Sequence, residues 1–457
     1  MTPFDSAAYA ALTKGLDVRE ITFSHVLMAD AMRMEAEFYT TTASAFESTT
    51  GAGAIRFSQY GTSKELNERS NGVPVLRLNE FDLSFIGCPA KWSTLSIDEF
   101  NALKLKSGDV LICRTNGNPH LVGKSALVCE DADIAFASYL FRVRPKESVI
   151  NAATLVAFLN SRYGRVEIER YAMRGNQANF SPAKFRLIKI PLLGNKLNRA
   201  VAKIMHEAYS QNIKARKCYE AAEVELERVL SIDAWRPTEG NISVKTFADA
   251  MNAGRIDAEY FQLRHDEILA RLKSLGKFEY ASEILVAGLE KVVPESIERY
   301  IELADVGAQG TIEECTDAEW RDLPSRARQR IRSGQIIVSS IEGSLESCAL
   351  VEGEFDNALC STGFHRFHSE QTNSETLLLI FKSWPLQSLL KRGCSGTILT
   401  GISSSELERI PVPILPRKVQ DSLAKKVRKA FALRKESKKL IAEARQMVED
   451  AIDGKVA

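Results

Sequence analysis

The chain has 457 residues, of which 45% are hydrophobic and 26% are charged, a composition typical of a soluble protein with sizeable cores. Its 60 basic and 59 acidic residues give a net charge of +1, so a cationic surface for nucleic acid could exist only locally. No apolar run approaches the roughly 20 residues that a membrane span requires, and residues 1–5 show no leader pattern. Eight cysteines without a Cys-x-x-Cys pair indicate core thiols in a reducing compartment. The sequence therefore predicts a cytoplasmic protein with no membrane partner.

The first module is predicted to span residues 1–196 and to be rich in short strands. After a polar stretch at residues 40–72, apolar runs bounded by turn signals predict strands at residues 73–78, 110–113, 126–128 and 139–143. A helix is predicted at residues 154–161, and a strand that closes the module at residues 185–192. Short strands with appended helices indicate the α+β class.

A long helix is predicted next, in a segment that spans residues 197–236. Apolar or small residues recur there at steps of three and four, which is the near-3.5 period of a coiled-coil seam. The seam consists of Val201, Ile204, Ala208, Ala215, Cys218, Ala222, Leu226 and Val229. At 1.5 Å per residue this helix would be about 50 Å long, so it could hold two modules a fixed distance apart.

The second module, residues 237–416, repeats the first. Met28-Ala-Asp-Ala-Met32 returns as Phe247-Ala-Asp-Ala-Met251, and Ser107-Gly-Asp-Val-Leu-Ile112 returns as Ser333-Gly-Gln-Ile-Ile-Val338. Further matches in the same order are residues 35–38 with 257–260, 75–78 with 300–303, and 189–191 with 409–411. Strands are predicted at residues 301–303, 336–339, 348–351, 364–367 and 410–415, and a helix at 375–381. The matching motifs occur in the same order in both halves, at an offset of about 220 residues. This predicts two tandem domains of one design.

A second long helix is predicted in residues 417–457. Its apolar residues match those of the first helix, with Leu423 for Val201, Val427 for Met205, Ala430 for Ala208, Ala444 for Ala222 and Val448 for Leu226. Neither helix could bury its seam alone, so we expect the two helices to pack as an antiparallel coiled coil. The predicted fold is thus α+β, with two similar strand-rich domains separated by two long helices and related by a pseudo-twofold axis.

No motif of catalytic chemistry is complete in this chain. Residues 118–125 resemble a phosphate-binding loop, but asparagine replaces the first glycine and the following residues predict a strand instead of a helix. His365 and His368 lie on a predicted strand, where residues three apart point to opposite faces and cannot share a metal. An Asn/Asp-Pro-Pro-aromatic motif for amino-group methylation is also missing. We therefore predict no catalytic residue, no metal and no cofactor in this chain.

Polar loop residues of the first module are candidates for nucleic-acid contact. Arginine can bind guanine, and asparagine or glutamine can bind adenine, through two parallel hydrogen bonds. The candidates between residues 174 and 179 are Arg174, Asn176, Gln177 and Asn179. Arg114 and Asn116 follow a predicted strand end, Lys124 lies in the next loop, and all three suit phosphate or base contact. The alternative is that all of these residues belong to ordinary exposed turns.

The corresponding loops of the second module have different chemistry. Lys391-Arg-Gly-Cys-Ser-Gly-Thr397 keeps a basic residue and glycines but has no side-chain amide. The candidate DNA contacts of this module are Ser339, Ser340, Arg366, Arg392, Ser395 and Thr397. Unlike loops on one design would bind two different short sequences, which favours an asymmetric bipartite target over a palindrome.

The last helix carries the densest local charge. Eleven lysines and arginines lie between Arg417 and Arg445, against only three acidic residues. Such a stripe could neutralise DNA phosphates, which would make the affinity depend steeply on salt. The alternatives are a solvated flank of the coiled coil and a surface that binds an acidic partner subunit.

This pattern resembles the DNA-specificity (S) subunit of type I restriction–modification systems, over nearly the whole chain. The resemblance rests on residues 75–78, 107–112 with Arg114, 122–124, 158–161, 175–179 and 190–191, with a weaker echo in the second half. It implies two target-recognition domains that bind double-stranded DNA on either side of a non-specific spacer. It also implies two modification (methyltransferase) subunits as partners, and a restriction (translocase) subunit that can join. S-adenosylmethionine, ATP and Mg²⁺ would then belong to those partner subunits.

The predicted function is therefore a non-catalytic subunit that binds an asymmetric bipartite DNA site and recruits methyltransferase subunits. One alternative is a coiled-coil adaptor that joins two protein ligands without nucleic acid. Another is a fragment of an enzyme with an unrecognised active site. Salt titration of binding to random duplex DNA would separate the first two, and turnover of labelled S-adenosylmethionine would reveal the third.

Overall fold

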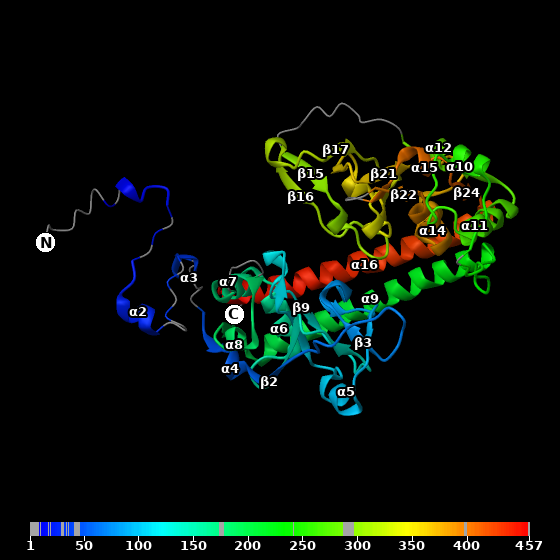
Figure 1. Cartoon of the computed structure of the whole chain (residues 1–457). Coiled ribbons are helices and arrows are strands. Elements are labelled where there is room, and N and C mark those ends of the chain that lie inside the picture. Colours follow the sequence, from blue (N-terminus) through cyan, green and yellow to red (C-terminus); the bar gives the residue numbers. More distant parts are fainter. Residues whose placement is uncertain are drawn as a thin grey trace. The chain divides into compact units, whose positions relative to one another are not determined.

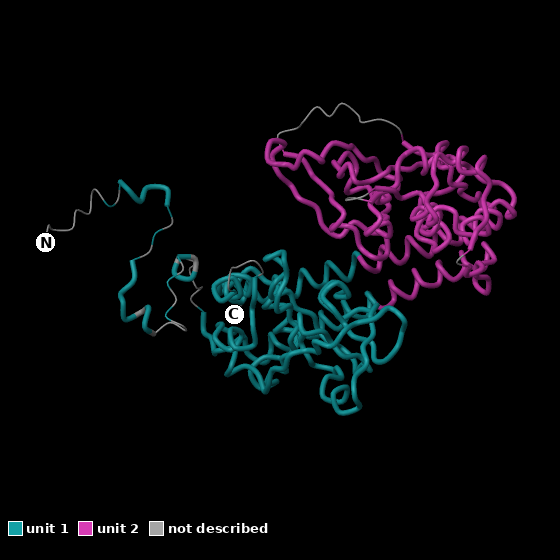
Figure 2. Tube along the Cα trace, in the orientation of Figure 1, with its two compact units in different colours: residues 1–212, 435–457 teal, residues 213–434 magenta. Residues whose placement is uncertain are grey.

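The computed structural model describes residues 46–172, 178–240, 242–286, 297–396 and 400–455, together with parts of the first 45 residues. The chain forms two compact units, which are shown in Figure 2. Unit 1 consists of residues 1–212 and 435–457, and unit 2 consists of residues 213–434. The boundaries fall inside the two long helices, α9 (Gly194–Val229) and α16 (Arg417–Ile452), so each unit contains one half of each helix.

Unit 1 is built around a six-stranded sheet with the strand order β2-β11-β7-β9-β5-β4, of which β2 and β9 are labelled in Figure 1. These strands are β2 (Ile55–Tyr60), β4 (Phe81–Asp82), β5 (Phe85–Ile86), β7 (Val110–Cys113), β9 (Ser125–Leu127) and β11 (Leu140–Pro145). A three-stranded sheet contains β3 (Val73–Leu76), β6 (Trp92–Ser93) and β10 (Ala135–Phe136). Two ladders pair β1 (Ser48–Thr50) with β13 (Lys189–Pro191), and β8 (Thr115–Asn116) with β12 (Ala178–Asn179). The helices are α2 (Phe23–Met28), α3 (Ala36–Thr40), α4 (Gly51–Ala54), α5 (Ile97–Leu103), α6 (Ala152–Leu159), α7 (Arg162–Tyr171) and α8 (Pro182–Phe185).

The side chains of β7 alternate between two hydrophobic cores, one on each face of the sheet of unit 1. Val110 and Ile112 pack in a core that includes every residue of α6 except Thr154, whereas Leu111 and Cys113 pack in a second core with β3 and β10. Successive side chains of a strand point to opposite faces, so four consecutive buried residues in β7 require cover on both sides. Burial raises the pKa of the Cys113 thiol to about 11, as expected for a core cysteine.

Unit 2 has the same kind of layered core around β18 (Ile336–Ser339). This strand lies between β19 (Cys348–Leu350) and β21 (Phe364–Phe367). A four-stranded sheet contains β16 (Thr316–Glu319), β15 (Ile297–Ile301), β20 (Leu359–Ser361) and β17 (Ala327–Arg330). Two ladders pair β14 (Phe278–Tyr280) with β24 (Pro411–Pro413), and β22 (Cys394–Ser395) with β23 (Gly401–Ile402). The helices are α10 (Phe247–Ala253), α11 (Leu263–Ser274), α12 (Ala281–Ile284), α13 (Ser374–Lys382), α14 (Trp384–Gly393) and α15 (Ser404–Leu407).

The pairing of the central strands is the same in both units. The central strand of each pairs antiparallel with the next one in the same register, and a second pair of strands is parallel in both. The matching antiparallel pairs are Leu111 with Ala126 and Ile337 with Ala349, and the matching parallel pairs are Leu76 with Phe136 and Ile301 with Cys360. The predicted internal repeat is therefore confirmed by the backbone pairing.

An asparagine begins the helix that covers the sheet in each unit. The side chains of Asn151 and Asn373 each accept a hydrogen bond from the backbone amide three residues on, which caps α6 and α13. Asn151 also donates to the carbonyl oxygen of Asn198 in α9 (2.7 Å), and the amide of Asn373 donates to the side chain of Gln420 in α16 (2.9 Å). The same cap thus fastens each module to the long helix that follows it.

The two long helices pack against each other in both units. In unit 1 the Ser437 hydroxyl donates to the carbonyl oxygen of Ala208 (2.8 Å), and in unit 2 Lys426 forms an ion pair with Glu225. Residue numbers rise along α9 from 208 to 225 while those of the contacting residues fall from 437 to 426, so the helices are antiparallel. The predicted seam residues Val201, Ala208, Ala222, Leu226, Leu423, Val427, Ala430, Ala444 and Val448 are all buried. The predicted coiled coil is therefore confirmed, and each helix is 36 residues long.

Some predicted segments differ from the structure. Residues 185–192 are not one strand, because Ser181 caps a helical turn that begins at Pro182 and leaves only the short strand β13. The stretch of residues 40–72 contains β2, an edge strand of the main sheet, which the sequence did not predict. Helices α7 and α14 were not predicted either. The division at residues 196, 236 and 416 and the pseudo-twofold axis stay predictions.

Candidate nucleic-acid interface

Two predicted contact segments of unit 1, which are far apart in the sequence, meet at the end of β7. Strand β8 pairs with β12, so that Asn116 lies opposite Ala178 and Asn179 lies opposite Thr115. The amide of Phe180 then donates to the carbonyl oxygen of Arg114 (2.7 Å). The predicted contacts Arg114, Asn116 and Asn179 are therefore neighbours, whereas Arg174, Asn176 and Gln177 lie outside the described residues.

Exposed tyrosines surround Arg114. Its guanidinium carbon lies 5.3 Å from the ring centroid of Tyr60 in β2, and its amide donates to the carbonyl oxygen of Tyr139 (2.7 Å). Tyr60 is 47% exposed and Tyr139 is 57% exposed. Aromatic faces beside arginine are suited to stack on bases and to approach a phosphate backbone. The sequence pattern missed Tyr60, because β2 lies in a stretch whose polar residues suggested a loop, and it gave Tyr139 only as the first residue of a predicted strand.

Lys124 adds a second cation at the same edge of the sheet. Its carbonyl oxygen accepts a hydrogen bond from the amide of Cys113 (2.8 Å), the residue before Arg114. Lys124 and Arg114 are therefore adjacent across the β7–β9 ladder, and both side chains are partly exposed. Both cations lie at one edge of the sheet, where each could contact a nucleic-acid backbone.

The loop between Asn116 and Lys124 is ordered by its own polar groups. The side chain of Asn116 accepts from the amide of Asn118 (2.8 Å), and the side chain of Asn118 accepts from the amide of His120 (3.0 Å). Arg165 in α7 donates to the carbonyl oxygens of Val122 (2.7 Å) and His120 (3.1 Å). Burial lowers the pKa of Arg165, yet an arginine side chain stays charged at neutral pH. Arg165 thus positions an exposed loop, a role that the sequence did not reveal.

The equivalent edge of unit 2 has the same backbone hydrogen bonds but has neutral residues at the positions of Arg114 and Lys124. Ile402 donates to the carbonyl oxygen of Ser340 (2.8 Å) as Phe180 does to that of Arg114, so Ser340 is the counterpart of Arg114. The amide of Ser339 donates to the carbonyl oxygen of Ser347 (3.0 Å), which makes Ser347 the counterpart of Lys124. The Ser340 hydroxyl donates to the carbonyl oxygen of Gly363 (2.9 Å). This edge therefore presents small hydroxyls where unit 1 presents cations.

The structure corrects the prediction for Ser339 and Arg366. Ser339 is fully buried, and its hydroxyl oxygen accepts from the amide of Ile341 (3.1 Å). Arg366 is buried in the sheet, where its guanidinium donates to the carbonyl oxygen of Arg330 (2.6 Å). Neither side chain can reach a duplex without leaving the core, because β18 and β21 are covered on both faces.

Arg392 has a different role in the structure. Its guanidinium carbon lies 4.3 Å from the ring centroid of Tyr260, and its Nε donates to the carbonyl oxygen of the same residue (3.1 Å). Arg392 thus fastens the segment around Tyr260 to α14. Ser395 is exposed in β22, and Thr397 lies outside the described residues. DNA contact by Ser340, Arg392, Ser395 and Thr397 stays a prediction.

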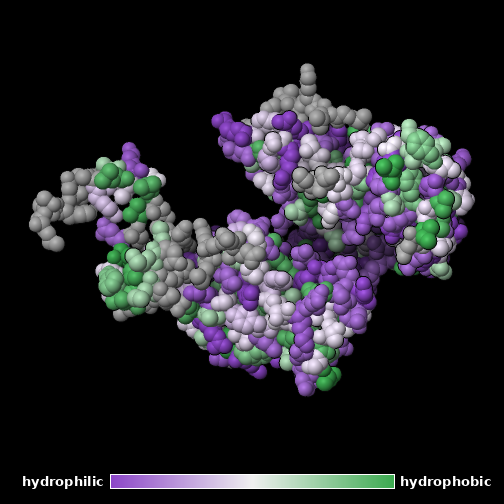
Figure 3. Space-filling view, in the orientation of Figure 1, coloured by the Kyte–Doolittle hydropathy of each residue, from purple (hydrophilic) through white to green (hydrophobic). Residues whose placement is uncertain are grey.

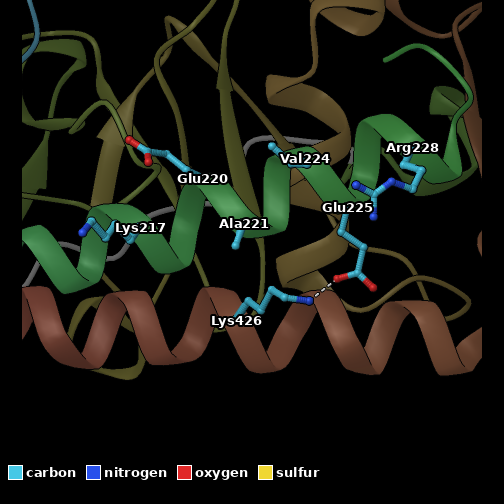
Figure 4. A pocket seen from close by; sticks show the side chains of 7 residues that line it. All are labelled: Lys217, Glu220, Ala221, Val224, Glu225, Arg228 and Lys426. Carbon is cyan, nitrogen blue, oxygen red and sulfur yellow. Dashed lines mark hydrogen bonds and ion pairs between the residues drawn. The ribbon is translucent and has the colours of Figure 1, made fainter. Parts of the chain in front are cut away.

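A shallow groove lies along the paired helices of unit 2 (Figure 4). Its lining residues are Lys217, Glu220, Ala221, Val224, Glu225, Arg228 and Lys426. The ion pair of Glu225 with Lys426 joins α9 to α16, and Ser422 donates to the same carboxylate (3.1 Å). The groove mixes both signs of charge around the exposed Val224.

Within the ranges that the structure describes, the acidic, histidine and cysteine side chains form no cluster that could hold a metal ion. The described helices also include none with the length and apolar character needed to cross a membrane.

The chain matches no protein-family model and no curated protein. Among the solved structures that it matches is the S subunit of a type I restriction–modification system from M. genitalium, with 12% identity over 90% of this chain and 96% of that chain, at a TM-score of 0.39. Another is the HsdS subunit from Thermoanaerobacter tengcongensis, with 13% identity, 90% and 97% coverage and a TM-score of 0.30. A third comes from work on complex assembly and conformational transition of the type I restriction–modification system, with 14% identity, 89% and 97% coverage and a TM-score of 0.29. The chain is similar to each of these three proteins.

Proposed function

We propose that this chain is a non-catalytic DNA-specificity subunit that binds an asymmetric, bipartite site on double-stranded DNA. The observation that supports it best is the pair of equivalent sheet edges with unlike side chains. One edge carries Arg114 and Lys124 beside exposed tyrosines, and the other carries Ser340 and Ser347. A duplicated scaffold with different groups at the same backbone positions is what recognition of two different short sequences requires.

Duplication also has an energetic reason. A good bidentate contact discriminates between bases by about 1–3 kcal/mol, so one module with one or two contacts would be only modestly specific. Two modules on one chain add their contributions when both are bound. The continuous helices α9 and α16, which pass from one unit into the other, are the elements that would set the spacing between the two half-sites.

The proposal includes partner subunits. The chain would recruit two methyltransferase subunits, which bind S-adenosylmethionine, and a restriction subunit that uses ATP and Mg²⁺ could join them. The chain itself then supplies sequence recognition and assembly. Loss of one split methylation motif from the methylome of a host that lacks this chain would support the proposal. An unchanged methylome would contradict it.

The adaptor that joins two proteins without DNA is the second candidate. It is favoured by the groove of mixed charge along α9 and α16. The two functions differ in their dependence on salt, because DNA binding through phosphate contacts weakens steeply as salt is raised. Binding to random duplex DNA that is absent, or insensitive to salt, both with and without the methyltransferase subunit would favour the adaptor.

A further inference from the structure

One polar residue of each long helix lies at the point where the helix leaves the unit in which it begins. Unit 1 contains α9 as far as Asn212, and unit 2 contains α16 as far as Arg434 (Figure 2). The two residues are 222 positions apart, which is also the offset between the seam residues Val201 and Leu423. They therefore occupy equivalent positions of the repeat, and we name them the two exit residues.

Both exit residues are buried, although they are polar. Hydrophilic residues cover much of the visible surface in Figure 3, whereas Asn212 is 3% exposed and Arg434 is 7% exposed. A buried polar group costs free energy unless it is hydrogen-bonded. The exit residues therefore need partners inside their own units.

The partner of each exit residue is a carboxylate on a hairpin of the same unit. The Nδ2 of Asn212 donates to the carboxylate of Asp82 in β4 (2.7 Å). The Nε of Arg434 donates to the carboxylate of Glu313 (2.7 Å), to which the Thr311 hydroxyl also donates. The same contact is thus made twice, once by an amide and once by a guanidinium.

The acid of unit 2 lies at a hairpin position where unit 1 has a glycine. In unit 1 the amide of Gly87 donates to the carbonyl oxygen of Glu80 (2.8 Å). In unit 2 the amide of Glu313 donates to the carbonyl oxygen of Asp305 (2.7 Å), so Gly87 and Glu313 are counterparts.

The acid of unit 1 likewise lies where unit 2 has a glycine. The hairpins pair Phe81 with Ile86 in unit 1 and Val306 with Ile312 in unit 2. Asp82 and Gly307 each follow the first residue of these pairs and are counterparts too. A Cβ atom at Gly307 would lie 2.4 Å from the Oε1 of Glu313, and one at Gly87 would lie 3.4 Å from the Cβ of Asp82. In each hairpin the glycine therefore lies beside the acid of the other strand.

The two hairpins share the contact with the exit residue, although they carry the acid on different strands. An apolar pair could fill the same space, but apolar packing is non-directional. A hydrogen bond fixes a distance and an angle. The contact is therefore suited to hold the helix in one direction as it leaves the module.

Each hairpin also bonds to a strand that begins at the sheet edge. The donor amides and acceptor carbonyl oxygens are those of Leu127 in β9 with Ser84 (2.8 Å) and of Leu350 in β19 with Gly310 (2.9 Å). These strands begin directly after Lys124 and Ser347, which are equivalent edge residues. Hydrogen bonds therefore link each exit residue to its sheet edge through the hairpin.

We infer that Asn212 and Arg434 are positioning residues, which fix the direction in which each long helix leaves its module and thereby the length of the DNA spacer. The inference rests on the proposed function. About half of each helix lies beyond its exit residue, which is about 25 Å at 1.5 Å per residue. A change of about 8° in direction would move the far end by about 3.4 Å, the rise of one base pair.

The test uses duplexes that carry the split methylation motif of the host, with the native spacer or with one base pair more or fewer. The full chain is titrated with each duplex in the presence of the methyltransferase subunit of its host. The wild type should bind the native spacer at least about fivefold more tightly than either neighbour, because a misplaced half-site loses base contacts. Arg434→Met and Asn212→Leu should each lose most of this preference.

A rescue variant separates positioning from stability. Glu313→Gly with Arg434→Asn removes the contact of unit 2, and Gly307→Asp then adds a carboxylate on the strand that carries it in unit 1. The triple variant should regain the preference for the native spacer, and the double variant should not. Arg428→Met is the matched control, because it removes an ion pair of the same helix with Glu375 (2.5 Å) but lies before the exit residue. It should keep the wild-type preference.

Circular dichroism identifies the variants that fold, and if Arg434→Met does not fold, Asn212→Leu and the triple variant carry the test. A wild-type preference in a folded exit variant would overturn the inference, as would a folded triple variant without the preference. If the wild-type chain recognises no split motif, the proposed function fails, and small-angle X-ray scattering of the free chain decides whether the exit residues fix the helices. A broader distribution of interatomic distances in the exit variants than in the wild type and Arg428→Met supports that role, and equal distributions exclude it.

Discussion

The edge of the main sheet in unit 1 and the equivalent edge in unit 2 have the same backbone and different side chains. In both units, the residue just after the central strand accepts a backbone hydrogen bond from a segment much later in the sequence, Phe180 in unit 1 and Ile402 in unit 2. That residue is Arg114 in one unit and Ser340 in the other. The loop beyond it is fastened from the second helix by Arg165 in unit 1 and by Gln387 in unit 2, which donates to the carbonyl oxygen of Leu345 (3.2 Å).

The comparison teaches that the scaffold and the recognition chemistry vary separately. Backbone hydrogen bonds and the alternating cores position the edge, and they constrain only buried residues. Side chains at the edge have no such constraint, so they can differ between copies without changing the fold. A protein that must bind two unlike targets can therefore use one fold twice.

The largest effect is expected from Arg142, which is buried in β11 of unit 1. Its Nη1 donates to the Asp109 carboxylate (3.0 Å), which is fully buried and also receives the Nε of Arg144 (2.8 Å). Arg142→Met should lower the free energy of unfolding of unit 1 by about 3–5 kcal/mol, because a buried charge loses a partner. Urea denaturation should then show unit 1 unfolding before unit 2. Arg144→Met, at a more exposed arginine on the same carboxylate, should cost less, and an equal cost would contradict this account.

The second prediction transfers the edge of unit 2 to unit 1. The double variant Arg114→Ser with Lys124→Ser should bind DNA more weakly than the wild type. Loss of Arg114 alone accounts for about 1–3 kcal/mol if it contacts a base through two hydrogen bonds. The slope of log affinity against log salt should also become shallower by about 0.9 for each lost phosphate contact. Fluorescence anisotropy with a labelled duplex measures both quantities. The reverse exchange, Ser340→Arg with Ser347→Lys, should steepen the slope, and no change in either variant would remove these residues from the interface.

The third prediction concerns the residue that positions the loop. Arg165→Gln introduces the residue that unit 2 has at the equivalent position, Gln387. It should leave one hydrogen bond to the loop, whereas Arg165 makes two. The lost hydrogen bond is worth about 1 kcal/mol, so DNA affinity should fall a few-fold while Arg114 and Lys124 remain in place. Hydrogen exchange of the amides of residues 120–124 should become faster. Weaker binding without faster exchange would show that Arg165 contacts DNA directly.

The smallest effect is expected where the helix pair differs between the units. Glu225 and Lys426 of unit 2 stand where unit 1 has Met447 and Ile204, at an offset of 222 residues. Lys426→Ile alone should cost less than about 1 kcal/mol, because this pair is partly exposed to solvent. Adding Glu225→Met should recover that loss, since apolar residues of similar volume can replace an ion pair. A large penalty in the double variant would mean that the groove is needed for packing.

The same ion pair gives a dependence on pH. Burial raises the pKa of Glu225, but the hydrogen bonds from Lys426 and Ser422 together lower it by more. The net shift of the pKa is therefore downward. A carboxylate with a lowered pKa in the folded state contributes stability above its unfolded value of about 4.3, and the contribution is lost as the pH falls. The difference in unfolding free energy between wild type and Lys426→Ile should therefore shrink below about pH 4.3. A difference that grows toward acid would contradict the assignment.

Strands 336–339 and 364–367 and the seams of both long helices could be predicted closely from the sequence. Short runs that contain apolar residues between turns and a near-3.5 apolar period are local signals, and the predicted bounds agree with the structure. The exposure of individual polar residues could not be predicted. Ser339 and Arg366 look like loop or surface residues in the sequence, but each lies inside a sheet that is covered on both faces. Arg165 gave no signal, because its partners are carbonyl oxygens more than 40 positions away.

By itself the sequence determined the duplication and the apolar seams of the two long helices, because a repeated motif order and an apolar period can both be read by comparing residues along the chain. Only the tertiary structure decided which polar side chains share a surface. Strand pairing brings Arg114 next to Asn179 and Tyr60, and it buries Ser339 at the position equivalent to Cys113. It also decided that Asp82 meets Asn212 and that Glu313 meets Arg434 where the long helices leave their units. The physical reason is that burial depends on contacts between distant segments, and a local pattern does not contain them.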